Sequence, residues 1–145
     1  MPRPNAAAMT FPDFSGLTFL VVEDDRDSRG FLGELLRARG AIVVEADSVR
    51  AAKAFAGTMK LDMIVTDLAM PAEDGAMLLK WLREQPRDRG GAVPTVAVTA
   101  FYEQYEPDQV SGWAAQTFRK PLKIDNFVQA IAAILNLPGA ELPKH

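Results

Sequence analysis

The chain has 145 residues, enough for about one domain with a single sizeable core, and its 48% hydrophobic and 24% charged residues are ordinary for a globular fold. A net charge of −3 argues against a nucleic-acid-binding surface, and the lack of cysteine excludes a disulfide framework and a thiolate metal site. There is no apolar run of about 18 residues and no signal-peptide apolar region, so we expect a cytoplasmic protein that binds neither membranes nor nucleic acid directly.

The apolar pattern predicts alternating strands and helices between two flanking segments. Residues 1–16 predict a flexible N-terminal extension, in which Phe11 and Phe14 are candidates for packing on the domain, and residues 138–145 predict a C-terminal tail. In chain order, the predicted elements are a strand at about 17–22, a helix at about 26–39, a strand at 41–44, a helix capped by Asp47 or Ser48, a strand at about 61–66, a helix capped by Asp74, a strand at 94–99, a weak helix near 107–113, a short strand at 116–119 and a helix at about 124–136.

This order of elements predicts an α/β fold of the (βα)₅ type. The strands at 17–22, 61–66 and 94–99 are near-continuous apolar runs, which are typical of strands buried on both faces. Strands that alternate with helices indicate a parallel sheet with right-handed crossovers. We therefore expect a three-layer sandwich with the flavodoxin-like strand order 2-1-3-4-5. Ligands of such sheets bind at the carboxyl ends of the strands, beside the first strand.

Carboxylates follow two of the predicted strands at this edge. Glu23 and Asp24 come directly after the first strand, and Asp67 ends the third and opens the loop Asp67-Leu68-Ala69-Met70-Pro71. Carboxylates within a few Å of one another repel by roughly 4 kcal/mol per pair at an effective dielectric constant of about 20. Such a cluster is tolerated mainly where it binds a cation, and oxygen-only ligands indicate Mg²⁺. The pattern predicts a metal-assisted phosphoryl site.

Two later strands also end in polar residues, Thr99 after the fourth and Lys120, followed by Pro121, after the fifth. Together with the three acids, these residues resemble the receiver domain of two-component response regulators over about residues 17–137. The resemblance implies that Asp67 is the nucleophile. It would take a phosphoryl group from the phosphohistidine of a sensor histidine kinase or a histidine phosphotransfer protein and form an aspartyl phosphate.

The resemblance also implies the roles of the other residues. Asp24, Asp67 and the backbone carbonyl of Ala69 would hold Mg²⁺, with Glu23 acting partly through water. Thr99 would hydrogen-bond one phosphoryl oxygen and Lys120 would reach another, and the Lys120–Pro121 bond would be cis. Such a domain catalyses only its own phosphorylation and dephosphorylation, and it signals through contact with a downstream protein, which the sequence does not identify.

Other features of the sequence agree with a phosphoryl acceptor that does not use ATP itself. The chain has one histidine, the terminal His145, and no glycine-rich nucleotide loop. Because no residues remain after 138 for an output domain, we expect either a stand-alone regulator or a receiver fragment of a larger hybrid kinase or regulator.

Two alternatives belong to other functional classes. Asp25-Arg26-Asp27-Ser28 fits the Asp-x-Asp-x-Ser/Thr pattern of haloacid-dehalogenase-like phosphatases, with Asp25 as nucleophile, but that assignment leaves the Asp67 loop unexplained. We interpret Asp25 and Asp27 instead as acids that favour the start of a helix. A flavin-binding module of the same fold would need amides and hydroxyls after the first strand, where this chain has carboxylates.

The sequence departs from the receiver pattern at one position. Receivers usually carry Tyr or Phe three residues before the lysine, whereas this chain has Thr117 there and Phe118 one residue later. We therefore expect the phosphorylation signal to leave the site by another route. The side chains predicted to repack against the short helix that carries Val110 and Trp113 are those of Tyr102, Tyr105 or Phe118.

Overall fold

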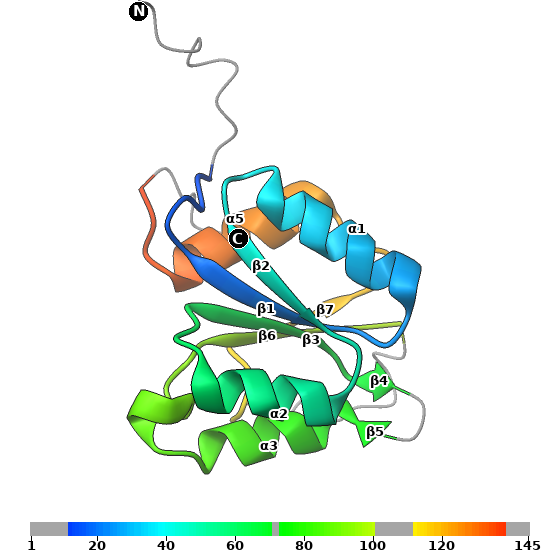
Figure 1. Ribbon diagram of the computed structural model, residues 1–145. Helices are drawn as coiled ribbons and strands as arrows, with labels where there is room; N and C mark the ends of the chain where they lie inside the picture. The colour runs from blue at the N-terminus through cyan, green and yellow to red at the C-terminus, as the bar shows by residue number, and fades with distance from the viewer. Residues whose placement is uncertain (1–11, 71–72, 101–111, 139–145) are drawn as a thin grey trace, which may run out of the picture.

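A parallel five-stranded sheet forms the middle layer of the protein, and helices cover both of its faces (Figure 1). This computed structural model describes residues 12–70, 73–100 and 112–138. The strand order is β2-β1-β3-β6-β7, so the prediction of a three-layer sandwich with order 2-1-3-4-5 is confirmed. The strands of the sheet are β1 (Thr18–Val22), β2 (Ile42–Ala46), β3 (Met63–Asp67), β6 (Thr95–Thr99) and β7 (Gln116–Arg119).

Helices α1 and α5 cover one face of the sheet, and α2 and α3 cover the other (Figure 1). The helices are α1 (Arg26–Arg37), α2 (Val49–Thr58), α3 (Gly75–Arg83) and α5 (Ile124–Ile134). The sequence did not predict the antiparallel pair β4 (Ala69–Met70) and β5 (Glu73–Asp74) or the 3₁₀ turn η2 (Arg87–Arg89). The helix predicted near 107–113 lies largely outside the described residues. Across the described ranges, no helix is both long and apolar enough to cross a bilayer.

Side-chain caps begin the first two helices. The carboxylate of Asp25 accepts a hydrogen bond from the Ser28 amide at 2.8 Å, so Asp25 is the N-cap of α1. Of the two predicted caps of α2, Ser48 is the one used, because its hydroxyl accepts from the Ala51 amide at 3.1 Å. The side chain of Asp74, the predicted cap of α3, lies outside the described part of the structure.

Phe14, within the predicted N-terminal extension, belongs to the core between the sheet and the layer of α1 and α5. Its side chain is 0% exposed, and its ring centre lies 5.2 Å from that of Phe19 in β1. Its amide donates a hydrogen bond to the carbonyl oxygen of Arg39 at 2.7 Å. The packing foreseen for Phe14 is therefore confirmed, and Phe11 lies outside the described residues. Burying a ring of this size contributes about 1.5–3 kcal/mol to stability.

The strand register brings the carboxyl ends of the strands to one edge of the sheet. Val22 of β1 pairs with Thr66 of β3, so the residues that follow them, Glu23 and Asp67, lie next to each other. On the other side of β3, Asp67 pairs with Val98 of β6. Strand β7 pairs in turn with β6, which places the end of β7 at the same edge.

Candidate functional site

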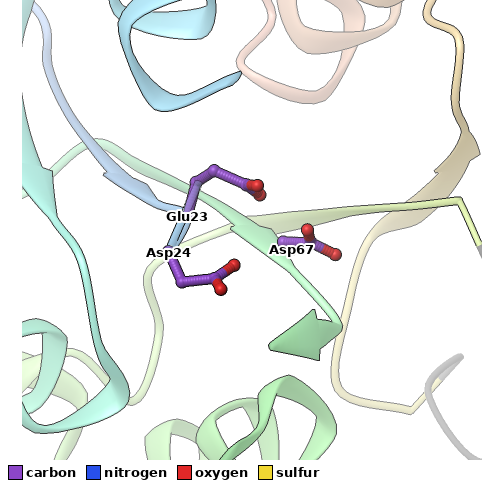
Figure 2. Close-up of side chains that lie close together, drawn as sticks. All are labelled: Glu23, Asp24 and Asp67. Carbon is purple, nitrogen blue, oxygen red and sulfur yellow. The ribbon is translucent and has the colours of Figure 1, made fainter. Parts of the chain in front are cut away.

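Three carboxylates converge at this edge of the sheet. Figure 2 shows the side chains of Glu23 and Asp24, directly after β1, close to that of Asp67, at the end of β3. Each of these residues has a carboxylate oxygen within 4.8 Å of one from each of the others. Glu23 and Asp67 are buried, with 2% and 5% of their surface exposed, whereas Asp24 is exposed. Two of the three negative groups are thus largely shielded from water.

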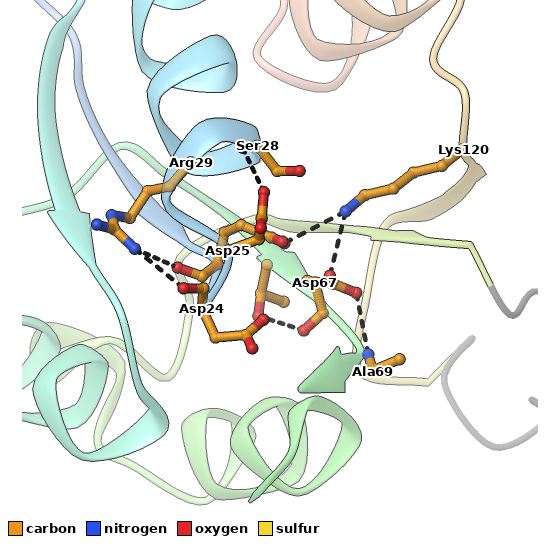
Figure 3. Close-up of polar contacts among 9 residues, drawn as sticks. Asp24, Asp25, Ser28, Arg29, Asp67, Ala69 and Lys120 are labelled. Carbon is orange, nitrogen blue, oxygen red and sulfur yellow. Dashed lines mark hydrogen bonds and ion pairs between the residues drawn. The ribbon is translucent and has the colours of Figure 1, made fainter. Parts of the chain in front are cut away.

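Lys120, at the end of β7, supplies positive charge to the two buried carboxylates. Its Nζ atom lies 3.1 Å from Oδ2 of Asp67 and 3.3 Å from Oε2 of Glu23 (Figure 3). The Lys120 side chain is 23% exposed, so this ion-pair partner is only partly buried. The Lys120–Pro121 peptide bond is cis, as expected.

The backbone around Asp67 holds its carboxylate from the other side. Oδ1 of Asp67 accepts a hydrogen bond from the Ala69 amide at 3.0 Å (Figure 3). Gly75, the first residue of α3, packs so closely on this loop that a Cβ atom there would lie 2.2 Å from the Asp67 carbonyl oxygen and 2.7 Å from Cα of Leu68. Only glycine permits this approach. Nothing in the sequence indicated this role for Gly75, which stands there only as the residue after Glu73 and Asp74.

Burial and charge shift the pKa values of two of these groups. Burial, followed by the hydrogen bond and the charge of Asp67, raises the pKa of Glu23 to about 8, against the opposing effect of Lys120. Partial burial by itself lowers the pKa of Lys120, but the charges of Asp67 and Glu23 together outweigh it and raise that pKa. The raised pKa of Glu23 means that this buried site disfavours a second negative charge beside Asp67, so added positive charge there would be favourable. Such an oxygen-only set fits a hard divalent cation.

Thr99 lies on the strand between those that carry Asp67 and Lys120. It is 0% exposed at the end of β6, and its carbonyl oxygen accepts a hydrogen bond from the Lys120 amide at 2.9 Å. The structure therefore brings Glu23, Asp24, Asp67 and Lys120 into one cluster and places Thr99 at the same sheet edge. Ala69 joins them through its amide.

Asp25, the proposed nucleophile of the phosphatase alternative, has a structural role in α1. The hydrogen bonds that its carboxylate receives from Ser28 lower its pKa. Asp27 lies exposed in the first turn of the same helix. Both acids thus act as expected for residues that favour the start of a helix.

Phe118, which we predict to repack on phosphorylation, lies on the face of the sheet opposite Trp113. Its ring packs edge-on against Phe127 of α5, with 5.1 Å between ring centres and 79° between ring planes. Trp113 instead packs against the cluster on the other face of the sheet, which includes Leu79 and Ala97. Neighbouring residues of a strand point to opposite faces, so Phe118 cannot take the place of Thr117. Tyr102, Tyr105 and Val110, named in the same prediction, lie outside the described residues.

Comparisons with known proteins agree with this geometry. The family model of the response regulator receiver domain matches residues 19–132. An uncharacterized 14.6 kDa protein of Leptolyngbya boryana is 36% identical over 85 residues, which span 59% of this chain and 63% of the relative. The polar-differentiation response regulator DivK of Brucella ovis is 25% identical over 117 residues, or 80% of this chain and 94% of the relative. The receiver domain of a sensor histidine kinase from Pseudomonas aeruginosa PAO1, solved with a magnesium ion coordinated in its active site cleft, has a TM-score of 0.75 at 24% identity and covers 84% of this chain and 99% of that one.

Proposed function

Because this chain belongs to the family of response regulator receiver domains, we propose that it takes a phosphoryl group onto Asp67 from the phosphohistidine of a sensor histidine kinase or a histidine phosphotransfer protein. The observation that carries this proposal is the environment of Asp67. Its carboxylate is buried in one cluster with Glu23 and Asp24, and the Lys120 ammonium lies 3.1 Å away. An acceptor aspartate needs both an anchored carboxylate and positive charge for the incoming phosphoryl oxygens.

In the transfer step, a carboxylate oxygen of Asp67 attacks phosphorus. The new O–P bond forms as the N–P bond of the donor breaks, and the electron pair returns to the imidazole nitrogen, which takes up a proton. The Ala69 amide holds the nucleophile in place at 3.0 Å. Lys120, on a flexible stem, moves from the carboxylate to a phosphoryl oxygen, and the Thr99 hydroxyl donates to another.

We assign the cation site to Asp24, Asp67 and the backbone carbonyl of Ala69, with Glu23 acting partly through water. Bound there, Mg²⁺ would offset the repulsion among the carboxylates and the charge of the phosphoryl oxygens. The domain catalyses only its own phosphorylation and dephosphorylation.

The proposal also covers the organisation of the chain. Residues 17–137 form the receiver domain, residues 1–16 and 138–145 flank it, and Phe14 contributes to its core. The phosphorylated domain signals by binding a downstream protein, and we place it in the cytoplasm. The same chemistry serves a stand-alone regulator and a receiver that is part of a larger hybrid kinase or regulator.

Chemical labelling tests the acceptor directly. The protein is treated with acetyl phosphate and Mg²⁺, and tandem mass spectrometry locates the phosphoryl group. We expect it on Asp67 in the wild type and in Asp25→Asn, and no labelling in Asp67→Asn. An adduct on Asp24 or Asp25 would overturn the assignment. Steady hydrolysis of phosphomonoesters that is lost in Asp25→Asn but kept in Asp67→Asn would favour the phosphatase instead.

A further inference from the structure

Arg29, in the first turns of α1, reaches back to the turn that carries two of the three acids. Its Nη1 atom lies 3.0 Å from the backbone carbonyl oxygen of Glu23 and 3.4 Å from that of Asp24 (Figure 3). The side chain of Arg29 is 19% exposed, so most of it is buried. Because these hydrogen bonds are to the backbone of Glu23 and Asp24, they restrict the directions in which the two side chains can point.

A second layer of contacts holds Arg29 itself. Its Nε atom lies 3.4 Å from Oε1 of Glu45 in β2, and Oε2 of the same carboxylate lies 2.9 Å from Nη2 of Arg37. Gly33, between the two arginines on α1, leaves the space for this arrangement, because a Cβ there would lie 2.9 Å from Arg37 Nη1 and 3.1 Å from Glu45 Oε2. Glu45 is thus fixed between two arginines, and it fixes the direction of Arg29 in turn.

Strand β2 also forms a direct hydrogen bond with the turn that carries Glu23 and Asp24. The Glu23 amide donates to the carbonyl oxygen of Ala46 at 3.0 Å, while its carbonyl oxygen accepts from Arg29. The peptide groups on both sides of Glu23 are therefore anchored to β2, one directly and one through Arg29 and Glu45. Without the second anchor, Glu23 and Asp24 would be freer to turn away from Asp67, whose negative charge repels Asp24 when no cation is bound.

We propose that Arg29 is a positioning residue for the cation site. Together with Glu45 it holds the turn of Glu23 and Asp24 so that both carboxylates face Asp67 before the cation arrives. The inference rests on the proposed function only in that this cation site serves the phosphorylation of Asp67. Residues that orient the ligands of a metal commonly change its affinity by about 10–100-fold when they are replaced.

Titration with Mg²⁺ alone, followed by calorimetry, tests the proposal. We expect the Kd for Mg²⁺ to rise about tenfold in Arg29→Met and less in Glu45→Gln. The double variant should match Arg29→Met, since Glu45 acts through Arg29 and the two effects are then not additive. Arg26→Met is the matched control, because Arg26 is an exposed arginine of the same helix start, and it should leave the Kd within about twofold of the wild type.

Two further readouts separate positioning from a general loss of structure. In the Mg²⁺-free protein, amide chemical shifts of Glu23 and Asp24 should change in Arg29→Met while those of β6 do not. With acetyl phosphate, Arg29→Met should need more Mg²⁺ for half-maximal labelling yet approach the wild-type rate at saturation. If Arg29→Met does not fold, Arg29→Lys gives the same comparison, because a single ammonium cannot bridge the two carbonyls and Glu45.

The outcomes distinguish this inference from the function on which it rests. An unchanged Kd in Arg29→Met, or a change no larger than in Arg26→Met, would overturn the role of Arg29 even if Asp67 is labelled normally. Additive effects of Arg29→Met and Glu45→Gln would overturn the link through Glu45. A wild type that binds Mg²⁺ but is never labelled on Asp67 would overturn the proposed function, and the weaker binding of Arg29→Met would still support the positioning role.

Discussion

Lys120 Nζ lies 3.1 Å from Oδ2 of Asp67, although 53 residues separate them in the chain and a whole strand, β6, lies between theirs in the sheet. The same ammonium group lies 3.3 Å from Glu23. One cation thus compensates two buried acids that belong to different strands. A change that removes it takes away the ionic partner of Asp67 and the positive charge that opposes the rise in the pKa of Glu23.

Replacing Lys120 should therefore destabilise the Mg²⁺-free protein. Breaking a buried ion pair costs about 3–5 kcal/mol and an exposed one about 0–1 kcal/mol. Since the Lys120 side chain is 23% exposed, we expect Lys120→Met to lower the free energy of unfolding by about 2 kcal/mol at pH 7, between those limits. Urea denaturation measures the change, and Lys123→Met, an exposed lysine three residues later, is the control. Equal stability of the two variants would show that Lys120 does not offset the charge of the acids.

The raised pKa of Glu23 predicts a pH dependence of stability. The folded protein holds this proton up to about pH 8, whereas the unfolded chain releases it near the ordinary value of 4.5. Between these values the folded state binds more protons, so stability is greatest below about pH 4.5 for this group and is lost as the pH rises toward 8. The slope cannot exceed about 1.4 kcal/mol per pH unit, the limit for one proton.

Thermal melts from pH 5 to 9, in buffers without Mg²⁺, test this dependence. Glu23→Gln should remove the falling trend, because glutamine has no proton to lose. Saturating Mg²⁺ should flatten the wild-type curve, since the cation replaces the proton. A wild type and a Glu23→Gln variant with parallel pH profiles would contradict the raised pKa.

Mg²⁺ should stabilise the folded protein by binding the preformed carboxylates. At a free concentration of a hundred times Kd, the gain is about 2.7 kcal/mol. Asp24→Asn should raise the melting temperature of the Mg²⁺-free protein by relieving repulsion and should reduce the response to Mg²⁺. Asp67→Asn should raise it less, because that change also removes a partner of Lys120. The same Mg²⁺ response in Asp24→Asn as in the wild type would exclude Asp24 as a ligand.

Gly75→Ala should disturb the loop that begins at Asp67. The added methyl group would meet the Asp67 carbonyl oxygen and the backbone of Leu68, which cannot yield as a flexible side chain would. Overpacking of this kind costs about 1–3 kcal/mol. Gly30→Ala is a matched control in α1, where a Cβ meets nothing within 4 Å, and it should stabilise by about 0.5–1 kcal/mol. Urea denaturation and the rate of labelling by acetyl phosphate give the comparison, and a Gly75→Ala variant as stable and as rapidly labelled as the wild type would contradict the close approach.

The sequence predicted the strands and the position of the acids because both follow from local patterns, and the strand order was expected from the alternation of strands and helices. Continuous apolar runs mark buried strands, and Glu23, Asp24 and Asp67 each stand where such a run ends. Side-chain contacts between elements that are distant in the chain correspond to no local pattern in the sequence, so they were not predicted. The bond from Arg29 to the acidic turn depends on Glu45 in another element, and the close approach of Gly75 depends on how α3 packs.

The packing of Phe118 on Phe127 was missed for a different reason. Thr117 and Phe118 are neighbours in β7, and the alternation of a strand sends them to opposite faces. The strand prediction therefore already implies that Phe118 points to the face opposite Thr117, where its ring packs against Phe127. For Phe14 the residue type was informative although the surrounding sequence was not. The prolines before it allow no helix or strand periodicity, yet its aromatic ring is buried in the core.

The burial of Phe14 bears on how this domain can be transplanted. The family match begins at residue 19, yet a ring that is 0% exposed lies five positions earlier. A chimeric sensor joined at residue 17 or 19 would leave a hole beside Phe19, and losing a buried phenylalanine costs about 3–5 kcal/mol. An engineer who cuts at the edge of the recognisable family would therefore obtain a weakened receiver and could mistake its poor folding for a failed junction. Carrying residues 12–16 into the fusion avoids the defect.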